Sequence, residues 1–159
     1  YLQTPIGALL VAGDEAGLRY VGFPTGKGRV EPAPDWRQDA STLQEPLTQL
    51  AAYFAGERTD FDLTLAPTGT PFQLQVLEAL QTIPYGQTRS YAEIAAQIGR
   101  PQAVRAVGAA NGRNPIPVII PCHRVIGASG KLVGFGGGLE SKQFLLNLEA
   151  GDTQVVPGF

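Results

Sequence analysis

Residues 121–125 read Pro-Cys-His-Arg-Val, and they hold both the only cysteine and the only histidine of this chain. They follow an apolar run at residues 118–120 and precede a glycine-rich segment that begins at Gly127. A thiol and an imidazole that adjoin at the end of an apolar element favour a nucleophile beside its proton acceptor. The residue types alone leave a second interpretation open, in which Cys122 is a buried, inert side chain and His123 lies at the surface.

The adjacency of Cys122 and His123 sets a condition on the backbone. Only the thiolate is a strong nucleophile, and a free thiol with a pKa of about 8.5 is mostly protonated at neutral pH. Neighbouring side chains on an extended segment face opposite sides, so we expect the chain to turn here or a water to relay the proton. A catalytic base also needs a third group to orient it. Glu149, near the end of a helix expected over residues 139–150, is the candidate.

The composition excludes several classes of protein. With 159 residues and 43% hydrophobic content, the chain can bury a core as one large domain or two small ones. No apolar run reaches the ~18 residues of a membrane span, and no signal peptide is recognisable. A single cysteine excludes an internal disulfide and fits a reducing compartment. One cysteine and one histidine cannot form a Cys/His zinc site. We expect no metal and no cofactor.

The net charge of −2 conceals two oppositely charged halves. Residues 1–85 carry five basic and ten acidic side chains, whereas residues 86–146 carry seven basic and two acidic ones. The basic segment favours contact with a polyanion such as nucleic acid. The charges alone would also suit a solvated basic surface with no partner.

The first half of the chain predicts the order strand, strand, helix, strand, in a domain over residues 1–66. Residues 5–12 and 16–23 have the β-branched and aromatic content of strands and meet at a turn. Apolar residues then recur at helical spacing over residues 41–55, with Ser41 as the N-cap and Gly56 as the stop. Residues 61–65 alternate apolar with polar and predict the third strand.

The second half predicts a mainly helical domain over residues 70–159. A Thr-Pro pair at residues 70–71 is a favoured helix start. Residues 90–93, Ser-Tyr-Ala-Glu, form a capping-box pattern that opens a short helix ended by Gly99. A second helix over residues 102–111, after a short turn with glycine, completes a helix-turn-helix. Its small side chains would let the backbone approach a ligand closely.

Residues 108–138 read GAANGRNPIPVIIPCHRVIGASGKLVGFGGG, with Ser90-Tyr91 and Ala103-Val104-Arg105-Ala106-Val107 upstream. In order and spacing these segments resemble the O6-alkylguanine-DNA alkyltransferases, closely so over residues 70–150. The resemblance implies a ribonuclease H-like α/β domain, with a small three-stranded antiparallel sheet and a helix, before a winged-helix-like domain with the helix-turn-helix. It also implies repair of O6-alkylguanine by irreversible, single-turnover transfer of the alkyl group to a cysteine. Whether O4-alkylthymine is repaired too stays open.

The resemblance implies a role for each candidate catalytic residue. Cys122 attacks the alkyl carbon and keeps it as a thioether. His123 accepts the thiol proton through a water, and Glu149 orients the imidazole. Asn114 matches the asparagine whose side chain holds the turn between the recognition helix and the active site.

The resemblance also implies a DNA-contacting surface and a base pocket. Arg105 matches the finger that fills the space left by a flipped base, and Tyr91 helps to rotate the phosphate and bonds that base. The other residues implied to contact DNA are Ser90, Ala103, Ala106, Ala110 and Arg113. The implied base pocket comprises Tyr91, Val125, Leu132, Val133, Gly134, Phe135, Gly136, Gly137 and Lys142. Gly136 and Phe135 depart from residues frequent in relatives, which leaves the preferred alkyl group open.

The expected partner is double-stranded DNA that contains O6-alkylguanine, bound through its minor groove by a monomer. We expect a cytoplasmic protein of a bacterium or archaeon that has no membrane partner. One alternative is a non-catalytic alkyltransferase-like sensor, which flips the base without repairing it, although such relatives lack the cysteine. Another is a cysteine hydrolase, which would turn over repeatedly and would leave the helix-turn-helix and Arg105 unexplained.

Overall fold

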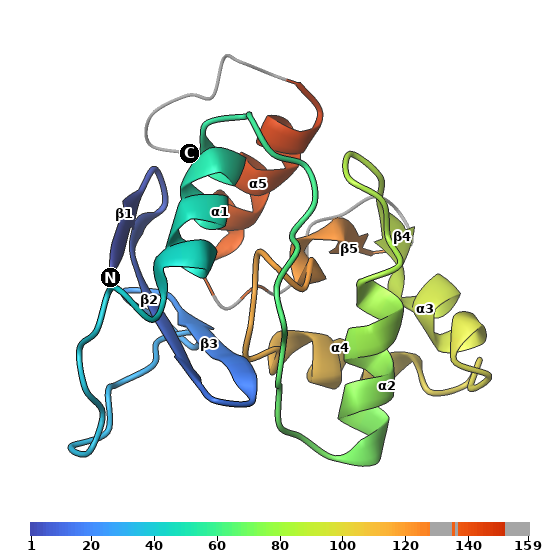
Figure 1. The fold of residues 1–159 in the computed structure, drawn as a ribbon. Coiled ribbons are helices and arrows are strands. Elements are labelled where there is room, and N and C mark those ends of the chain that lie inside the picture. Colours follow the sequence, from blue (N-terminus) through green and yellow to red (C-terminus); the bar gives the residue numbers. More distant parts are fainter. Residues whose placement is uncertain (128–134, 136, 152–159) are drawn as a thin grey trace.

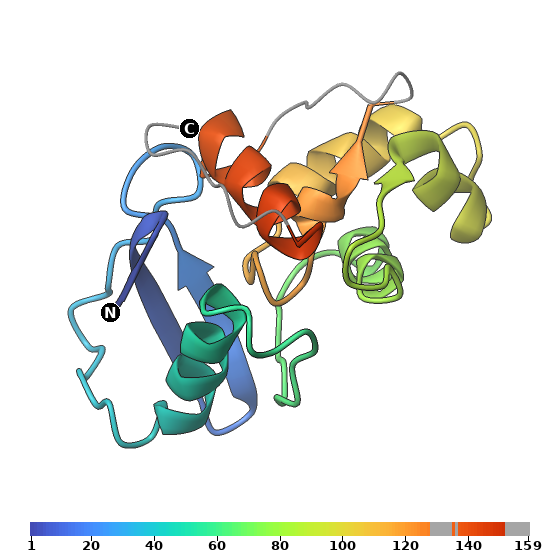
Figure 2. The same ribbon diagram turned by 90° about the horizontal axis from the view of Figure 1, so that it is seen from above.

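Two parts of the chain lie side by side in the structure, a computed structural model that describes residues 1–127, 135 and 137–151. One part is a three-stranded sheet covered by a helix, and the other is a group of three helices; a last helix lies where the two meet (Figures 1 and 2). A single buried cluster runs through both parts and includes Leu9, Leu50, Leu80, Val107 and Leu145. Within the described residues, no helix has the length and apolar character that a membrane crossing requires.

The sheet contains β1 (Leu2–Thr4), β2 (Gly7–Asp14) and β3 (Gly17–Gly22), antiparallel and in that order. This confirms a small three-stranded antiparallel sheet, but the prediction that residues 61–65 supply the third strand is wrong. That segment makes only a bridge between Leu65 and Leu18. The third strand is instead formed by residues 2–4, which a turn at residues 5–6 joins to β2. The Thr4 hydroxyl donates to the Gly7 carbonyl (2.7 Å) across this turn.

Helix α1 (Gln44–Phe54) covers the sheet and turns Leu50 and Tyr53 into the core. It begins three residues later than expected, because Asp39 binds the Ser41 hydroxyl (2.6 Å) and holds it in a preceding turn. Ser41 is therefore not the N-cap. Gly56 ends the helix as expected, in a left-handed conformation (φ 76°) that favours glycine.

Helices α2 (Pro71–Leu80) and α3 (Tyr91–Gln97) begin at the predicted capping signals. Thr70 and Ser90 are the N-caps, and each forms a reciprocal capping box with the side chain three residues on. Helix α4 (Val104–Gly112) starts two residues later than predicted, so residues 98–103 separate it from α3. Helix α5 (Leu139–Glu149) agrees with the expected terminal helix.

A short parallel pairing that the sequence did not predict joins β4 (Arg89–Ser90) to β5 (Val125–Ile126). A two-residue strand has no periodicity to detect, so only its partner reveals it. The pairing places the N-terminus of α3 next to the segment that carries Cys122. The start of the helix-turn-helix is thereby tied to the candidate nucleophile.

Candidate active site

A folded-back loop between α4 and Cys122 prepares the site. The Asn114 side chain bridges this loop, because its Nδ2 donates to the Ile120 carbonyl (2.8 Å) and its Oδ1 accepts from the Ile116 amide (3.0 Å). Val118, buried within the loop, has a φ of 73°, a conformation that a β-branched residue rarely adopts. The surrounding core holds it there. Asn114 thus lies where the sequence placed it, in the turn before the cysteine.

Cys122 begins a 3-10 turn, η1 (Cys122–Arg124), so the chain turns here as expected and does not stay extended. The cysteine is 4% exposed. Burial raises the pKa of its thiol to about 11, although a hydrogen bond from Asn114 and the charge of Lys142 oppose the shift. The resting thiol is therefore protonated at neutral pH and needs a base before it can attack.

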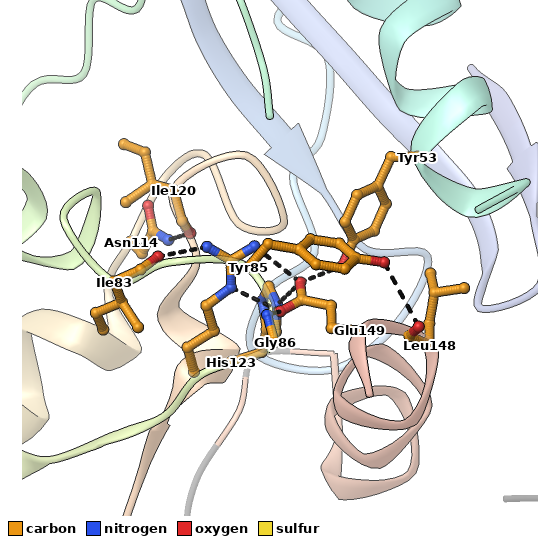
Figure 3. Close-up of polar contacts among 10 residues, drawn as sticks. Tyr53, Ile83, Tyr85, Gly86, Asn114, Ile120, His123, Leu148 and Glu149 are labelled. Atoms are coloured by element: carbon orange, nitrogen blue, oxygen red, sulfur yellow. Dashed lines mark hydrogen bonds and ion pairs between the residues drawn. The ribbon is translucent and has the colours of Figure 1, made fainter. Parts of the chain in front are cut away.

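His123 and Glu149 are in direct contact, with 2.6 Å between Nε2 and Oε2 (Figure 3). Burial raises the pKa of Glu149, but hydrogen bonds and charges from His123 and Arg124 outweigh this and lower it to about 2. An ionised carboxylate accepts hydrogen bonds only, so Nε2 carries the proton and Nδ1 the lone pair. Burial also lowers the pKa of His123, which keeps the imidazole neutral. Among the described residues, Nδ1 has no hydrogen-bond partner.

Arg124 binds the same carboxylate through two nitrogens, Nε to Oε1 (2.7 Å) and Nη2 to Oε2 (3.0 Å). Its Nη1 donates to the Ile83 carbonyl (2.7 Å), and its side chain is buried. With its guanidinium held on Glu149 and Ile83 in the core, Arg124 is a structural anchor of the site and not a phosphate contact. The Tyr53 hydroxyl is a further donor to Oε2 (2.6 Å), which the sequence did not indicate.

A cavity of about 200 Å³ lies beside Cys122, between the sheet and the end of α4. Asn114, Arg113 and Phe135 line it, together with Asn111 and with Tyr20 and Phe23 of the first half. Asn111 is 3% exposed, and its Nδ2 contacts the Cys122 carbonyl at 3.4 Å. Its Oδ1 has no partner among the described residues. Sequence reasoning missed Asn111; the only signal was a polar residue on the small-faced inner side of α4.

The expected base pocket falls partly outside the described residues, where Leu132, Val133, Gly134 and Gly136 lie. Lys142 is buried and donates to the Val125 carbonyl (2.7 Å), and burial lowers its pKa to about 8. Phe135 packs edge-on against Phe23 (ring centroids 5.2 Å apart). Gly137 also adjoins that ring, because a Cβ there would lie 2.7 Å from Phe23 Cε1. The first half of the chain therefore contacts this pocket directly.

The structure exposes some of the residues expected to contact DNA and buries others. Arg105 and Ala106 are exposed on the first turns of α4, Ala103 at its start is half-buried, and Arg113 beyond its end is exposed. Ala110 is only 4% exposed and belongs to the core, so its expected place on the DNA-contacting face is wrong. In the last turn of α4, Ala110 and Asn111 are buried, whereas residues 104–106 in the first turn are all exposed. Ser90 and Tyr91 lie together at the start of α3.

Tyr91 is half-buried, with its ring against Gly108 of α4. Burial, and to a lesser degree the negative charge that Cys122 would carry, raises the pKa of its hydroxyl. The hydroxyl therefore stays protonated in the neutral range. It lies close enough to Cys122 for their charges to interact, so the structure brings Tyr91 and the cysteine to one site.

A helix-turn-helix (α3 and α4) joined through the β4–β5 pair to a buried cysteine and a His–Glu pair is the combination expected of a DNA-binding protein with a nucleophilic thiol. Residues 1–67 match the family model described as 6-O-methylguanine DNA methyltransferase, ribonuclease-like domain, and residues 71–151 match the DNA binding domain of the same family. This chain therefore belongs to the 6-O-methylguanine DNA methyltransferase family. The activity of the family is DNA repair by transfer of an alkyl group to a cysteine of the protein.

Individual relatives agree with this assignment over most of their length. The methylated-DNA–protein-cysteine methyltransferase of Methanosarcina acetivorans is 56% identical over 92% of this chain and 94% of its own. The protein of that name from Mycobacterium tuberculosis is 53% identical over 93% and 89%, respectively. A crystal structure of Mycobacterium tuberculosis OGT in complex with DNA superposes with a TM-score of 0.88 and 52% identity, covering 95% of this chain and 91% of that one.

Proposed function

We propose that this chain repairs O6-alkylguanine in double-stranded DNA by moving the alkyl group to Cys122, once per molecule. The observation that carries the proposal is the arrangement around the thiol. Cys122 lines a cavity, and the next residue, His123, has a neutral imidazole with one nitrogen bound to Glu149 and a lone pair on the other. A buried protonated thiol with a neighbouring base suits a reaction that consumes the thiolate as it forms.

The reaction balances with the groups present. His123 Nδ1 takes the thiol proton, directly or through a water, and Glu149 stabilises the imidazolium that results. The Cys122 sulfur attacks the alkyl carbon in line with the bond to O6; an S–C bond forms as the C–O bond breaks. The electron pair of that bond stays on the guanine, which takes up the proton that the imidazole releases. Because a thioether is stable, Cys122 is not regenerated.

Access to a base in a stacked duplex requires that the base be flipped out, at a cost of a few kcal/mol. The exposed first turn of α4, with Arg105 and the small side chain of Ala106, supports insertion of this helix into the minor groove. Tyr91, at the start of α3, adjoins Gly108 of α4 and lies within electrostatic range of Cys122, which supports a contact with the flipped base. The related structure that contains DNA supports DNA as the partner. We infer that the protein acts as a monomer in the cytoplasm, where its thiol stays reduced.

Intact mass measurement tests the proposed function. After incubation with a duplex that carries one O6-methylguanine, we expect each chain to gain one methyl group, and peptide mapping to place it on Cys122. The modified base should be restored in equal amount, with no turnover beyond one equivalent. Methyl removal that continues past one equivalent would contradict the mechanism. Binding of the lesion with no change in mass would show a sensor.

Replacing Arg105 by alanine should separate base flipping from the chemistry. We expect duplex repair to slow by roughly tenfold to a hundredfold, because Arg105 no longer offsets the cost of extruding the base. Reaction with free benzylguanine, which needs no flipping, should stay near normal. Arg58→Ala, which removes the same charge from the loop after α1, is the control and should change neither rate. Equal losses on duplex and free base would contradict the role given to Arg105.

A further inference from the structure

Tyr53 belongs to α1, in the part of the chain that matches the ribonuclease-like domain, yet its hydroxyl reaches the candidate active site. The side chain is fully buried, and Oη donates to Glu149 Oε2 over 2.6 Å, between residues 96 positions apart in sequence (Figure 3). The rings of Phe54, Phe61 and Tyr85 surround the Tyr53 ring, with centroids 5.3 to 6.2 Å away. The hydrogen bond is therefore shielded from solvent.

We propose that Tyr53 is a positioning residue for alkyl transfer, which fixes the Glu149 carboxylate and thereby the orientation and basicity of His123. The proposal rests on the proposed function of Cys122 and His123. It makes the first half of the chain a contributor to the chemistry, since the donor to the catalytic carboxylate comes from α1.

The carboxylate oxygens are almost fully occupied by donors. Oε2 accepts from His123 (2.6 Å), Tyr53 (2.6 Å) and Arg124 (3.0 Å). Oε1 accepts from Arg124 (2.7 Å) and, more weakly, from the Gly86 amide (3.4 Å). Donors on several sides fix the rotation of a carboxylate, and His123 can take its observed orientation only if Oε2 stays in place. Tyr53 is the donor to Oε2 that the first half of the chain supplies.

Tyr53 also affects the proton affinity of the imidazole. A second strong donor on Oε2 draws negative charge away from the bond to His123, so the carboxylate stabilises an imidazolium less. Arg124 acts in the same direction but carries a positive charge, whereas a phenol adds none. Loss of the Tyr53 hydroxyl should therefore strengthen the pull of Glu149 on His123 and raise the pKa of the imidazole.

Other ionisable groups face the same carboxylate or imidazole. They are Arg124 of η1, Lys142 of α5 and Tyr85 of the turn before β4; Arg124 and Lys142 stay unchanged in the test, and Tyr85 is replaced only in the control variant. Tyr85 provides a matched control, because its ring also borders Tyr53 while its hydroxyl lies 3.5 Å from the Leu148 carbonyl and not on Glu149. If Glu149 served only to accept the hydrogen bond of the buried Tyr53 hydroxyl, replacing Tyr53 would not change the titration of His123.

The test compares Tyr53→Phe with Tyr85→Phe. We expect Tyr53→Phe to slow transfer from free benzylguanine about tenfold at pH 7, the size of one charge-assisted hydrogen bond, and to move the acidic limb of the pH–rate profile to higher pH. Tyr85→Phe should keep the rate and the profile. The chain has one histidine, so the His123 ring can be titrated by NMR without DNA. The His123 ring should titrate at higher pH in Tyr53→Phe than in the unsubstituted protein, and at the unchanged pH in Tyr85→Phe.

Incorporation of 3-fluorotyrosine at position 53 provides a variant that preserves the ring and makes the hydroxyl a stronger donor. It should move the His123 titration to lower pH, opposite to Tyr53→Phe. Slower transfer by Tyr53→Phe with an unchanged profile and titration would show a structural role only and overturn the proposal. If the unsubstituted protein takes no alkyl group while the titrations still differ, the proposed function fails, and with it the role of Tyr53 in transfer.

Discussion

Replacing Cys122 by serine is expected to abolish alkyl uptake, with a transfer rate at least about a thousandfold lower. A hydroxyl at this position keeps its proton far more tightly than a thiol, and the buried His123 has too little basicity to remove it. Burial already raises the pKa of the cysteine to about 11, so a still less acidic serine hydroxyl could not lose its proton to His123. Intact mass after incubation with a duplex that carries O6-methylguanine measures the result.

The serine variant should otherwise resemble the original protein. The two side chains are nearly equal in size, so duplex binding and the urea midpoint are expected to stay close to the original values. Demethylation that survives the substitution would contradict Cys122 as the acceptor and would reopen the search for a nucleophile. A variant that neither binds nor folds would show instead that the thiol has a structural role beyond the chemistry.

Replacing Glu149 by alanine should destabilise the fold by about 3–5 kcal/mol, because it leaves the buried guanidinium of Arg124 without its partner. The substitution also leaves the Tyr53 hydroxyl and the His123 Nε2 proton without an acceptor in the core. Urea unfolding at pH 7 measures the change. Glu140→Ala, in the exposed first turn of the same helix α5, is the matched control and should cost at most about 1 kcal/mol.

The stability difference between the original protein and Glu149→Ala should depend on pH in one direction. The pKa of Glu149 is lowered from 4.5 to about 2 on folding. Its charged form therefore stabilises the fold fully above pH 4.5, and this contribution is lost as the pH falls toward 2. The difference between the two proteins should shrink over that range. A difference that stays constant down to pH 2 would contradict an ionised, bonded Glu149.

Local signals in the sequence predicted local structure well. The capping boxes at Thr70 and Ser90 fixed the starts of α2 and α3, because each depends on side chains only three residues apart. The expected terminal helix and a turn at Cys122 are also confirmed. Ser41 failed as a cap because Asp39, two residues earlier, competes for its hydroxyl. The division into domains at residues 67–69 stays a prediction.

Pairing between distant segments could not be predicted in the same way. Residues 61–65 alternate like a strand, but they lie along β3 and make only the bridge from Leu65 to Leu18, whereas residues 2–4 pair with β2 as the third strand. The β4–β5 pair and the burial of Ala110 likewise depend on partners elsewhere in the chain. Glu149 was expected to orient His123, and the structure brings the two into contact. Asn111 and Tyr53 were not predicted, because their contacts with Cys122 and Glu149 depend on the packing of separate elements.

By itself, the sequence determined the chemical identity of the site: one thiol beside one imidazole, after an asparagine turn and a helix-turn-helix, because those features are short-range. The tertiary structure alone decided the protonation states and the partners of these groups. Burial keeps the Cys122 proton in place and the imidazole neutral, and neither depends on neighbours in sequence. The carboxylate that joins Tyr53, His123 and Arg124 gathers donors from 25 to 96 residues away, which only the packing of α1 and α5 brings together.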